Sequence, residues 1–479
     1  MKTFLLSPAL AAALLVPMPG HAQTSKDDII AQMAATKAPY EELALKIWNF
    51  AELGYQETQS SGAIQAQLKS EGFTVEAGVA GMPTAFIATY GSGHPIIGVL
   101  GEFDALPGVS QTADPVRTER PELTAGHACG HHLFGAGSTE AVVAVKNWLK
   151  ASGQKGTIRF YGTPAEEGGS GKVYLVRDGA FKDVDVVLHW HAGDRNLVTN
   201  SPSLANKSGK IRFHGIASHA AAAPERGRSA LDAVEALDFM MNMMREHVPD
   251  STRIHYVITR GGEAPNVVPA FAEVYYYVRS PDRTIVQDVW DRLEKAAEGA
   301  ALGTGTTWER EITGGVYDLL PNDTLARVMH ANFVKVGGVT YTDQEKEFAA
   351  KIGQTLPGGR HGALQIASTV QPFEYVRESG GSTDVGDVSW NVPTMGVRTA
   401  TWVPGTSSHS WQAVAAGGTT IGLKGMQVAA ETIALTAIDL FQQPETIKKA
   451  KAEFDERRGS DFKYQSLVGD RAPPLDYRN

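Results

Sequence analysis

Hydrophobic positions in the first part of the chain follow two spacings, one typical of helices and one typical of buried strands. Residues 95–101, PIIGVLG, form a continuous apolar run, as expected of a strand that is buried on both faces. The pattern predicts helices at 25–52, 60–70, 133–150 and 171–178, and strands at 73–75, 84–90, 95–101, 157–161 and 184–188. Strands that alternate with helices predict an α/β fold, with a central sheet covered by helices on both faces.

The pattern changes near residue 204. Expected strands at 210–214, 254–259 and 272–279 alternate polar and apolar residues, and expected helices at 229–246 and 283–301 lie between and after them. This order predicts a small α+β domain inserted into the chain. The α/β pattern returns after residue 325, and the polar tail 455–479 is expected to be irregular. We therefore expect one α/β domain built from residues 23–203 and 315–479, interrupted by an α+β domain over 204–314.

The amino terminus has the pattern of a secretory signal peptide over residues 1–22. Lys2 precedes an apolar run from Phe4 to Val16, and Gly20-His21-Ala22 offers small residues for cleavage. A membrane anchor is the alternative, but the apolar run is too short to cross a bilayer. We expect a periplasmic or secreted protein without stable membrane insertion. The net charge of −9 argues against nucleic acid as a partner, because nucleic acid requires a basic surface.

Potential metal ligands concentrate in residues 122–137, ELTAGHACGHHLFGAG, which include the only cysteine of the chain. Thiolate and imidazole ligands at this density suit a transition metal such as Zn, Mn, Co or Ni. The alternative is a buried cysteine beside histidines that cap the following helix. A lone cysteine in an exported protein cannot form an internal disulfide, and metal binding gives a reason to keep it.

Further candidate ligands follow other predicted strands. Glu166-Glu167 lies in the loop GTPAEEGGSG, where one carboxylate could bind metal and the other move protons. His189 and His191 end the strand 184–188; we expect them to diverge there, so that one of them is a ligand. Together with Cys129, His131, Glu167 and His409, the one ligand histidine at the strand end makes about five ligands, which is enough for two ions. The alternatives are a solvated glutamate pair and a surface histidine at 409.

The inserted domain carries three polar residues that could contact a substrate. His219 and Asn266 could donate to an oxyanion, and Arg279 could bind a substrate carboxylate. His219 could equally cap a helix, and Arg279 could pair with Asp282, so the residues alone leave both interpretations open.

Several motifs together resemble the M20 metallopeptidases, specifically their amidohydrolase branch. The motifs are EFDALPG from Glu102, GHACGH from Gly126, PAEEG from Pro164, SHAA from Ser218 and GSTDVGDVS from Gly381. The resemblance implies a catalytic α/β domain with a two-metal site, interrupted by a lid or dimerisation domain. It implies that Cys129 bridges two divalent ions and that His131, Glu167, His191 and His409 complete their ligands.

The resemblance also implies the remaining roles. Glu166 is expected to be the general base and acid, Asp104 to orient a ligand, and His219 and Asn266 to stabilise the oxyanion, reaching across a dimer. The expected metals are Mn or Zn, with Co and Ni also compatible. The expected partner is a second copy of the chain, and the resemblance leaves open whether a homologous partner subunit is also required.

The function that follows is an exported, metal-dependent amidohydrolase that cleaves N-acyl amino acids or aryl-amide conjugates of glutamate. One alternative is a dipeptidase or carboxypeptidase of the same family. Another is a non-catalytic periplasmic protein that binds metal or ligand. The presence of Glu166 argues against that second alternative, because a binding protein has no use for a general base.

Overall fold

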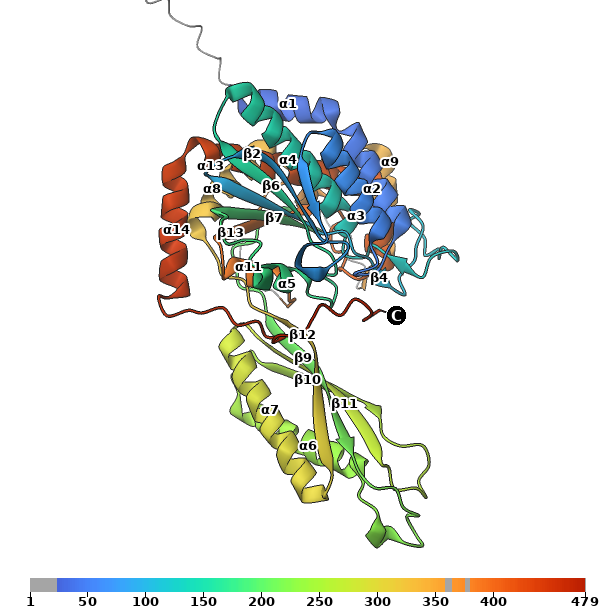
Figure 1. Ribbon diagram of the computed structural model, residues 1–479. Coiled ribbons are helices and arrows are strands. Elements are labelled where there is room, and N and C mark those ends of the chain that lie inside the picture. Colours follow the sequence, from blue (N-terminus) through green and yellow to red (C-terminus); the bar gives the residue numbers. More distant parts are fainter. Residues whose placement is uncertain (1–23, 358–363, 375–379, 479) are drawn as a thin grey trace, which may run out of the picture.

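The computed structural model describes residues 24–357, 364–374 and 380–478. The predicted signal peptide lies outside the described residues. Figure 1 shows a larger body that contains a central sheet between helices, and a smaller elongated body below it. Strands β9 and β12 lie at the junction between the two bodies. No helix among the described residues is long and apolar enough to cross a membrane.

The larger body is built on a seven-stranded sheet in the order β1-β2-β6-β3-β7-β13-β8. Strands β6, β3, β7 and β13 are parallel, while β1, β2 and β8 pair antiparallel at the two edges. Because the four parallel strands share one direction, their carboxyl ends open on one edge of the sheet, where α/β folds place their sites. The strands are β1 Thr74–Ala77, β2 Phe86–Ser92, β3 Ile96–Gly101, β6 Gly156–Gly162, β7 Val186–Gly193, β8 Leu197–Val198 and β13 Thr394–Ala400; a separate pair is β4 Leu106–Pro107 and β5 Ala125–Gly126.

Strand β3 is buried on both faces, as its apolar run predicts. Ile97 and Val99 pack into the core under helix α4 (His131–Ser152), whereas Ile96 and Leu100 pack on the opposite face with helix α5 (Gly171–Asp178). Alternate residues of a strand point to opposite faces, so one apolar run supplies both cores. The structure confirms the α/β fold class with a separate sheet domain.

The predicted helices 60–70, 133–150 and 171–178 match the helices Thr58–Ser70, His131–Ser152 and Gly171–Asp178, but the predicted helix 25–52 is two helices. The chain breaks at Lys37 because Pro39, in the first turn of the next helix, cannot continue an existing hydrogen-bond ladder. Helix α14, which holds Phe454 in the core, was not expected, so the irregular tail begins at Gly459 and not at residue 455. The helices are α1 Lys26–Thr36, α2 Ala38–Phe50, α3 Thr58–Ser70, α8 Asp323–Val336, α9 Asp343–Thr355, α10 Gln365–Ser368, α11 Val385–Ser389, α12 Trp411–Gly417, α13 Thr420–Gln442 and α14 Pro444–Arg458.

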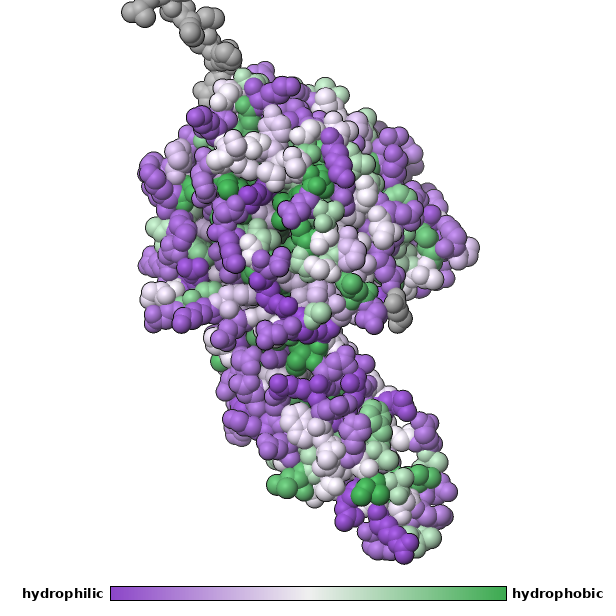
Figure 2. Space-filling model, in the orientation of Figure 1, coloured by the Kyte–Doolittle hydropathy of each residue, from purple (hydrophilic) through white to green (hydrophobic). Residues whose placement is uncertain are grey.

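The smaller body is a four-stranded antiparallel sheet in the order β10-β11-β9-β12, packed against two helices. Three strands were expected. The fourth, β12, was not predicted because its sequence, TWEREITGGV, is polar. The sequence is polar because much of this edge strand is exposed. The elements are β9 Ala205–His214, α6 Ala230–Met244, β10 Arg253–Arg260, β11 Phe271–Ser280, α7 Arg283–Thr304 and β12 Thr307–Val316, with 3₁₀ turns at Pro224–Arg226 and Arg245–His247 here and at Val79–Gly81 in the larger body. Apolar residues interrupt the polar surface of this body (Figure 2).

Candidate metal centre and active site

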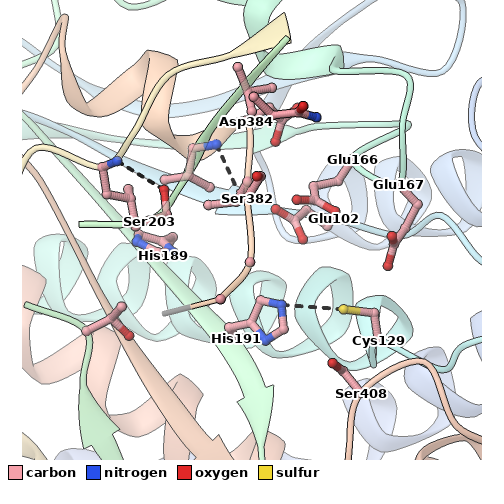
Figure 3. A pocket seen from close by; sticks show the side chains of 18 of the residues that line it. Glu102, Cys129, Glu166, Glu167, His189, His191, Ser203, Ser382, Asp384 and Ser408 are labelled. Atoms are coloured by element: carbon pink, nitrogen blue, oxygen red, sulfur yellow. Dashed lines mark hydrogen bonds between the residues drawn. The ribbon is translucent and has the colours of Figure 1, made fainter. Parts of the chain in front are cut away.

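The candidate ligands come together at the carboxyl edge of the parallel strands. Glu102 and Asp104 follow β3, Glu166 and Glu167 follow β6, and His191 lies near the end of β7. Figure 3 shows Glu102, Glu166 and Glu167 gathered near Cys129 and His191. The candidate ligands and catalytic residues therefore cluster at the strand ends, because the sheet brings the carboxyl ends of its parallel strands to one edge.

Cys129 and His131 are placed by the turn into helix α4, which begins at His131. Gly130 between them has φ of 86°, and a Cβ at this position would lie 2.7 Å from the Cβ of Ala192. Glycine is required here because the backbone adopts the left-handed region and approaches β7 closely. The Sγ atom of Cys129 then lies 3.4 Å from Nε2 of His191 (Figure 3).

Two groups of three ligand atoms share Cys129. One contains Cys129, His131 and His191, and the other contains Cys129, Glu167 and His409; in each group the atoms lie within 4.8 Å of one another. Nε2 of His409 lies 3.2 Å from Oε1 of Glu167. Two three-atom groups with a common thiol could hold a bridged pair of metal ions.

Hydrogen bonds orient two ligand histidines. Nδ1 of His131 lies 2.8 Å from Oδ1 of Asp104, so a proton on this Nδ1 leaves the Nε2 lone pair free to face the ligand group. Nδ1 of His191 lies 2.7 Å from the carbonyl oxygen of Ala192 and 3.1 Å from Nη1 of Arg398, while its Nε2 faces Sγ of Cys129. Nε2 of His131 is buried and has no hydrogen-bond partner among the described residues.

A third possible ligand group contains Glu102, His131 and Glu166. Glu102, however, is paired at 2.7 Å with Nζ of the fully buried Lys172, which also lies 2.8 Å from Asp384. Burial lowers the pKa of Lys172, but Asp384 and Glu102 outweigh it and raise that pKa above its ordinary value. The lysine therefore stays charged and is shared by both carboxylates, so we assign Glu102 to this ion-pair network and not to the metal.

The two histidines at the end of β7 lie on the same side of the strand, and the expectation that they diverge is wrong. The strand continues to Gly193, so His189 and His191 keep the two-residue alternation and both line the cavity, while Trp190 packs against Phe134 on the other side. His189 stacks over Gly396, where a Cβ would lie 2.4 Å from the ring. Only His191 belongs to a ligand group.

Two residues at the site adopt a left-handed backbone that is unfavourable for a side chain. Ala165, immediately before Glu166, has φ of 57°, and His409 has φ of 60°. Such conformations persist where the surrounding structure enforces them, and they concentrate at functional sites. The amide of His409 donates to the carbonyl of Ala128, which joins the loop after β13 to the Cys129 loop.

Glu166 lies beside the ligand groups, with Oε2 3.9 Å from Nε2 of His131. Burial raises the pKa of Glu166 well above its ordinary value, and the carboxylates of Glu102 and Glu167 raise it further. A carboxyl group in this environment can exchange a proton near neutral pH.

A cavity of about 460 Å³ opens onto the ligands, within the range for small-molecule sites. Its lining includes Arg279 from strand β11 of the smaller body, so the structure places this predicted substrate contact at the cavity. Arg279 forms no ion pair among the described residues, and Asp282 instead caps helix α7 by accepting from Thr284. The interpretation that Arg279 pairs with Asp282 is therefore not supported.

His219 and Asn266 do not line the cavity of their own chain. They lie in two loops that contact each other, where the amide of Ala220 donates to the carbonyl of Asn266. These loops follow β9 and precede β11 at the ends away from the cavity, and ten-residue strands place them about 30 Å from it.

Sequence reasoning missed three contributors. Glu102 and Asp384 lie in motifs that were recognised, but the sequence around them carries no signal that both pair with the buried Lys172. Arg478 lines the cavity from the carboxyl-terminal tail, and no motif marks it. The other two histidines of the motif, His127 and His132, are buried and contact the carbonyls of Ile47 and Gly417.

Comparison with known proteins identifies the family. Residues 205–304 match a model of the peptidase dimerisation domain of M20 enzymes. The chain is 41% identical to one of the p-aminobenzoyl-glutamate hydrolase subunits of Escherichia coli (strain K12) over 444 residues, which cover 88% of this chain and 92% of that protein. The chain belongs to the M20 peptidase family.

Other M20 relatives span much of the chain. A Xaa-Arg dipeptidase of Mus musculus is 29% identical, with coverage of 86% of this chain and 88% of the relative. A second p-aminobenzoyl-glutamate hydrolase subunit of E. coli (strain K12) is 29% identical over 61% of this chain and 67% of its own length. A Bacillus subtilis structure, described as a dinuclear metal-binding peptidase of the M20 family, has a TM-score of 0.59 at 17% identity and covers 87% of this chain and 99% of that chain. The last match shows the shared fold.

Proposed function

We propose that this M20 enzyme is an exported, metal-dependent amidohydrolase of N-acyl amino acids, with aryl-amide conjugates of glutamate as the preferred class. The observation that carries the proposal is the pair of ligand groups that share Cys129 next to Glu166 in one cavity. The 41% identity to a p-aminobenzoyl-glutamate hydrolase polypeptide supports the substrate class. Residues 1–22 support export through their signal-peptide pattern.

The residues fit two divalent cations. Nε2 of His131 is buried without a hydrogen-bond partner among the described residues, and a cation would satisfy it. Oε1 of Glu167 is buried 3.2 Å from Nε2 of His409, so these two ligand atoms lie close enough to share a cation. We propose that Cys129 bridges the ions, that His131 and His191 complete one site, and that Glu167 and His409 complete the other. Imidazole, thiolate and carboxylate together suit Zn or Mn, and Co and Ni are also compatible.

Bound cations would supply Lewis acidity for attack of water on the amide carbonyl. Glu166 accepts a proton from the attacking water on its carboxylate and later donates it to the nitrogen of the leaving amine. Water adds to the carbonyl carbon, the carbon–nitrogen bond breaks, and the products are a carboxylic acid and an amine. Arg279 lies on the cavity wall, where it can bind a carboxylate of the substrate.

We further propose that the enzyme works as a dimer through the smaller body. Its edge strand β10 exposes Val257 and Ile258, helix α6 exposes Phe239 and Met243, and apolar residues are visible on this body in Figure 2. An unpaired edge strand with apolar neighbours favours pairing with a second chain. Such a dimer could bring His219 and Asn266 of one chain to the cavity of the other, where they would stabilise the oxyanion.

The test is a hydrolysis panel with purified protein loaded with Mn or Zn. We expect turnover of p-aminobenzoyl-glutamate and of N-acetyl amino acids, and loss of turnover after chelation that is reversed by adding metal. The Xaa-Arg dipeptidase relative favours a second candidate, a dipeptidase. A strict requirement for a free α-amine would support the dipeptidase and exclude our proposal. Amino-terminal sequencing of exported protein should give a mature chain that begins after Ala22.

A further inference from the structure

The carboxyl-terminal segment, residues 459–478, returns from helix α14 to the active-site cavity. Figure 1 shows it running beneath the larger body at the junction with the smaller one. The segment contains no helix or strand, yet it is anchored at several points. The hydroxyl of Tyr464 donates to Asp387, and Nη1 of Arg177 donates to the carbonyls of Gly469 and Arg471 at 2.9 and 2.7 Å. Leu467 is buried beside Gly315 of β12, where a Cβ would lie 2.7 Å from it.

The end of this segment lies on the metal-ligand loop. The hydroxyl of Tyr477 donates to the carbonyl oxygen of Glu167 at 3.2 Å, and Nη2 of Arg478 donates to the same oxygen at 2.5 Å. The Tyr477 ring contacts Tyr55 edge to face, and Gly54 leaves room for it: a Cβ there would lie 2.3 Å from the Tyr477 hydroxyl. The loop and the tail are therefore shaped to fit each other.

Arg478 forms part of the cavity wall together with Arg279 of the smaller body. In each arginine the Nε atom is buried and has no hydrogen-bond partner among the described residues, and neither guanidinium has an ion-pair partner there. Three of the four carboxylates that line the cavity are engaged elsewhere: Glu102 and Asp384 pair with Lys172, and Glu167 pairs with His409. The fourth, Glu166, lies 3.9 Å from His131 and pairs with neither arginine among the described residues.

Two guanidinium groups that line one cavity without ion-pair partners are costly unless an anion binds them. Guanidinium matches carboxylate because it offers parallel N–H donors that are always charged. The same cavity is lined by the thiol, imidazole and carboxylate ligands proposed for metal. The cavity thus holds candidate metal ligands together with two guanidinium groups that are suited to negative charge.

We propose that Arg478 is a specificity-determining residue that binds the side-chain carboxylate of the substrate's amino-acid part, with Arg279 as the contact for the α-carboxylate. The preferred substrates are then N-acylated dicarboxylic amino acids, with one carboxylate for each arginine. This inference rests on the proposed amide hydrolysis and assigns its selectivity to the carboxyl-terminal tail.

The test compares two substrates that differ in one charge, p-aminobenzoyl-glutamate and p-aminobenzoyl-glutamine, with the metal-loaded full chain. Wild-type enzyme should prefer the glutamate substrate. Arg478→Gln should lower kcat/KM for that substrate by about 10- to 100-fold, mainly through KM, because a charge-assisted hydrogen bond is lost. It should change kcat/KM for the glutamine substrate by about twofold at most, and Arg478→Lys should restore part of the preference.

Tyr477→Phe is the matched control, because it removes the neighbouring hydrogen bond to the Glu167 carbonyl and keeps the guanidinium. It should leave the ratio between the two substrates unchanged. An equal loss for both substrates in Arg478→Gln, with lower metal content, would show that the arginine only holds the ligand loop and would overturn the proposal. Retention of the full glutamate preference would overturn it as well.

Calorimetric binding of free glutamate and glutamine separates this proposal from the proposed reaction. If wild-type protein hydrolyses neither amide, the proposed function fails. The tail proposal then stands if Arg478→Gln weakens glutamate binding by about tenfold or more and leaves glutamine binding unchanged, and it falls if both ligands bind the variant as they bind wild type.

Discussion

The carboxylate of Asp104 connects His131 to the backbone of Glu167. Oδ1 lies 2.8 Å from Nδ1 of His131, and Oδ2 accepts a hydrogen bond from the amide of Glu167 at 2.9 Å. Burial raises the pKa of Asp104, but the charge of His131 and these hydrogen bonds outweigh it, so the pKa lies below its ordinary value. One ionised carboxylate therefore orients ligands from both proposed metal sites.

Asp104→Asn should weaken metal binding by about 10- to 100-fold, because asparagine offers one oxygen acceptor where two donors need partners. Competition with a fluorescent chelator measures the affinity. The exposed Asp114, in the loop after β4, gives the control variant Asp114→Asn, which should bind metal like wild type. Unchanged affinity in Asp104→Asn would remove the orienting role.

Cys129→Ala should reduce the metal content of the protein below that of wild type, because both ligand groups contain this thiol. Elemental analysis after dialysis against a defined metal gives the ratio of metal to protein. Wild-type stoichiometry in the variant, with wild-type affinity at each site, would contradict a bridging cysteine.

Glu166→Gln should retain metal and lose turnover by about 100- to 10,000-fold, since the amide cannot accept a proton from water. The neighbouring Glu167→Gln is the contrasting variant, and we expect it to lose metal as well as activity. Elemental analysis and single-turnover kinetics distinguish the two glutamates. Near-normal turnover in Glu166→Gln would exclude it as the proton carrier.

His219→Ala should lower kcat and leave the metal content unchanged, because His219 lies outside the cavity of its own chain. Mixing His219→Ala with Glu166→Ala protein should restore about a quarter of wild-type activity if the smaller body acts across a dimer. Half of the dimers are then mixed, and each has one complete site. Demonstrably mixed dimers without activity would show that the two residues do not act in trans.

Lys172→Met should destabilise the protein by about 3–5 kcal/mol, because it leaves the carboxylates of Glu102 and Asp384 buried without their shared cation. Lys448 pairs with Glu445 on the exposed surface of α14, so Lys448→Met should change stability by about 1 kcal/mol or less. Urea unfolding of the two variants in metal-free buffer measures the difference. Equal midpoints would mean that the buried network contributes nothing to stability.

The α/β fold and much of the site could be predicted from local patterns. The apolar run of β3 can be buried only on both faces, and motifs around Cys129, Glu166 and His409 lie after such strands. The carboxyl ends of parallel strands lie at one edge of the sheet, so the topology alone predicts that residues far apart in the sequence lie close together there. The edge strand β12 escaped prediction because exposed strands need few apolar residues.

Tertiary structure alone decided which polar residues share an environment. His189 and His191 lie on the same side of β7, and only the packing of the strand beside the Cys129 loop, which brings Nε2 of His191 to 3.4 Å from Sγ of Cys129, distinguishes them. The burial of Lys172 between Glu102 and Asp384, and the return of Arg478 to the cavity, depend on contacts over long sequence separations. Sequence determines the spacing and chemistry of side chains, whereas their mutual distances and desolvation arise only when the whole chain packs.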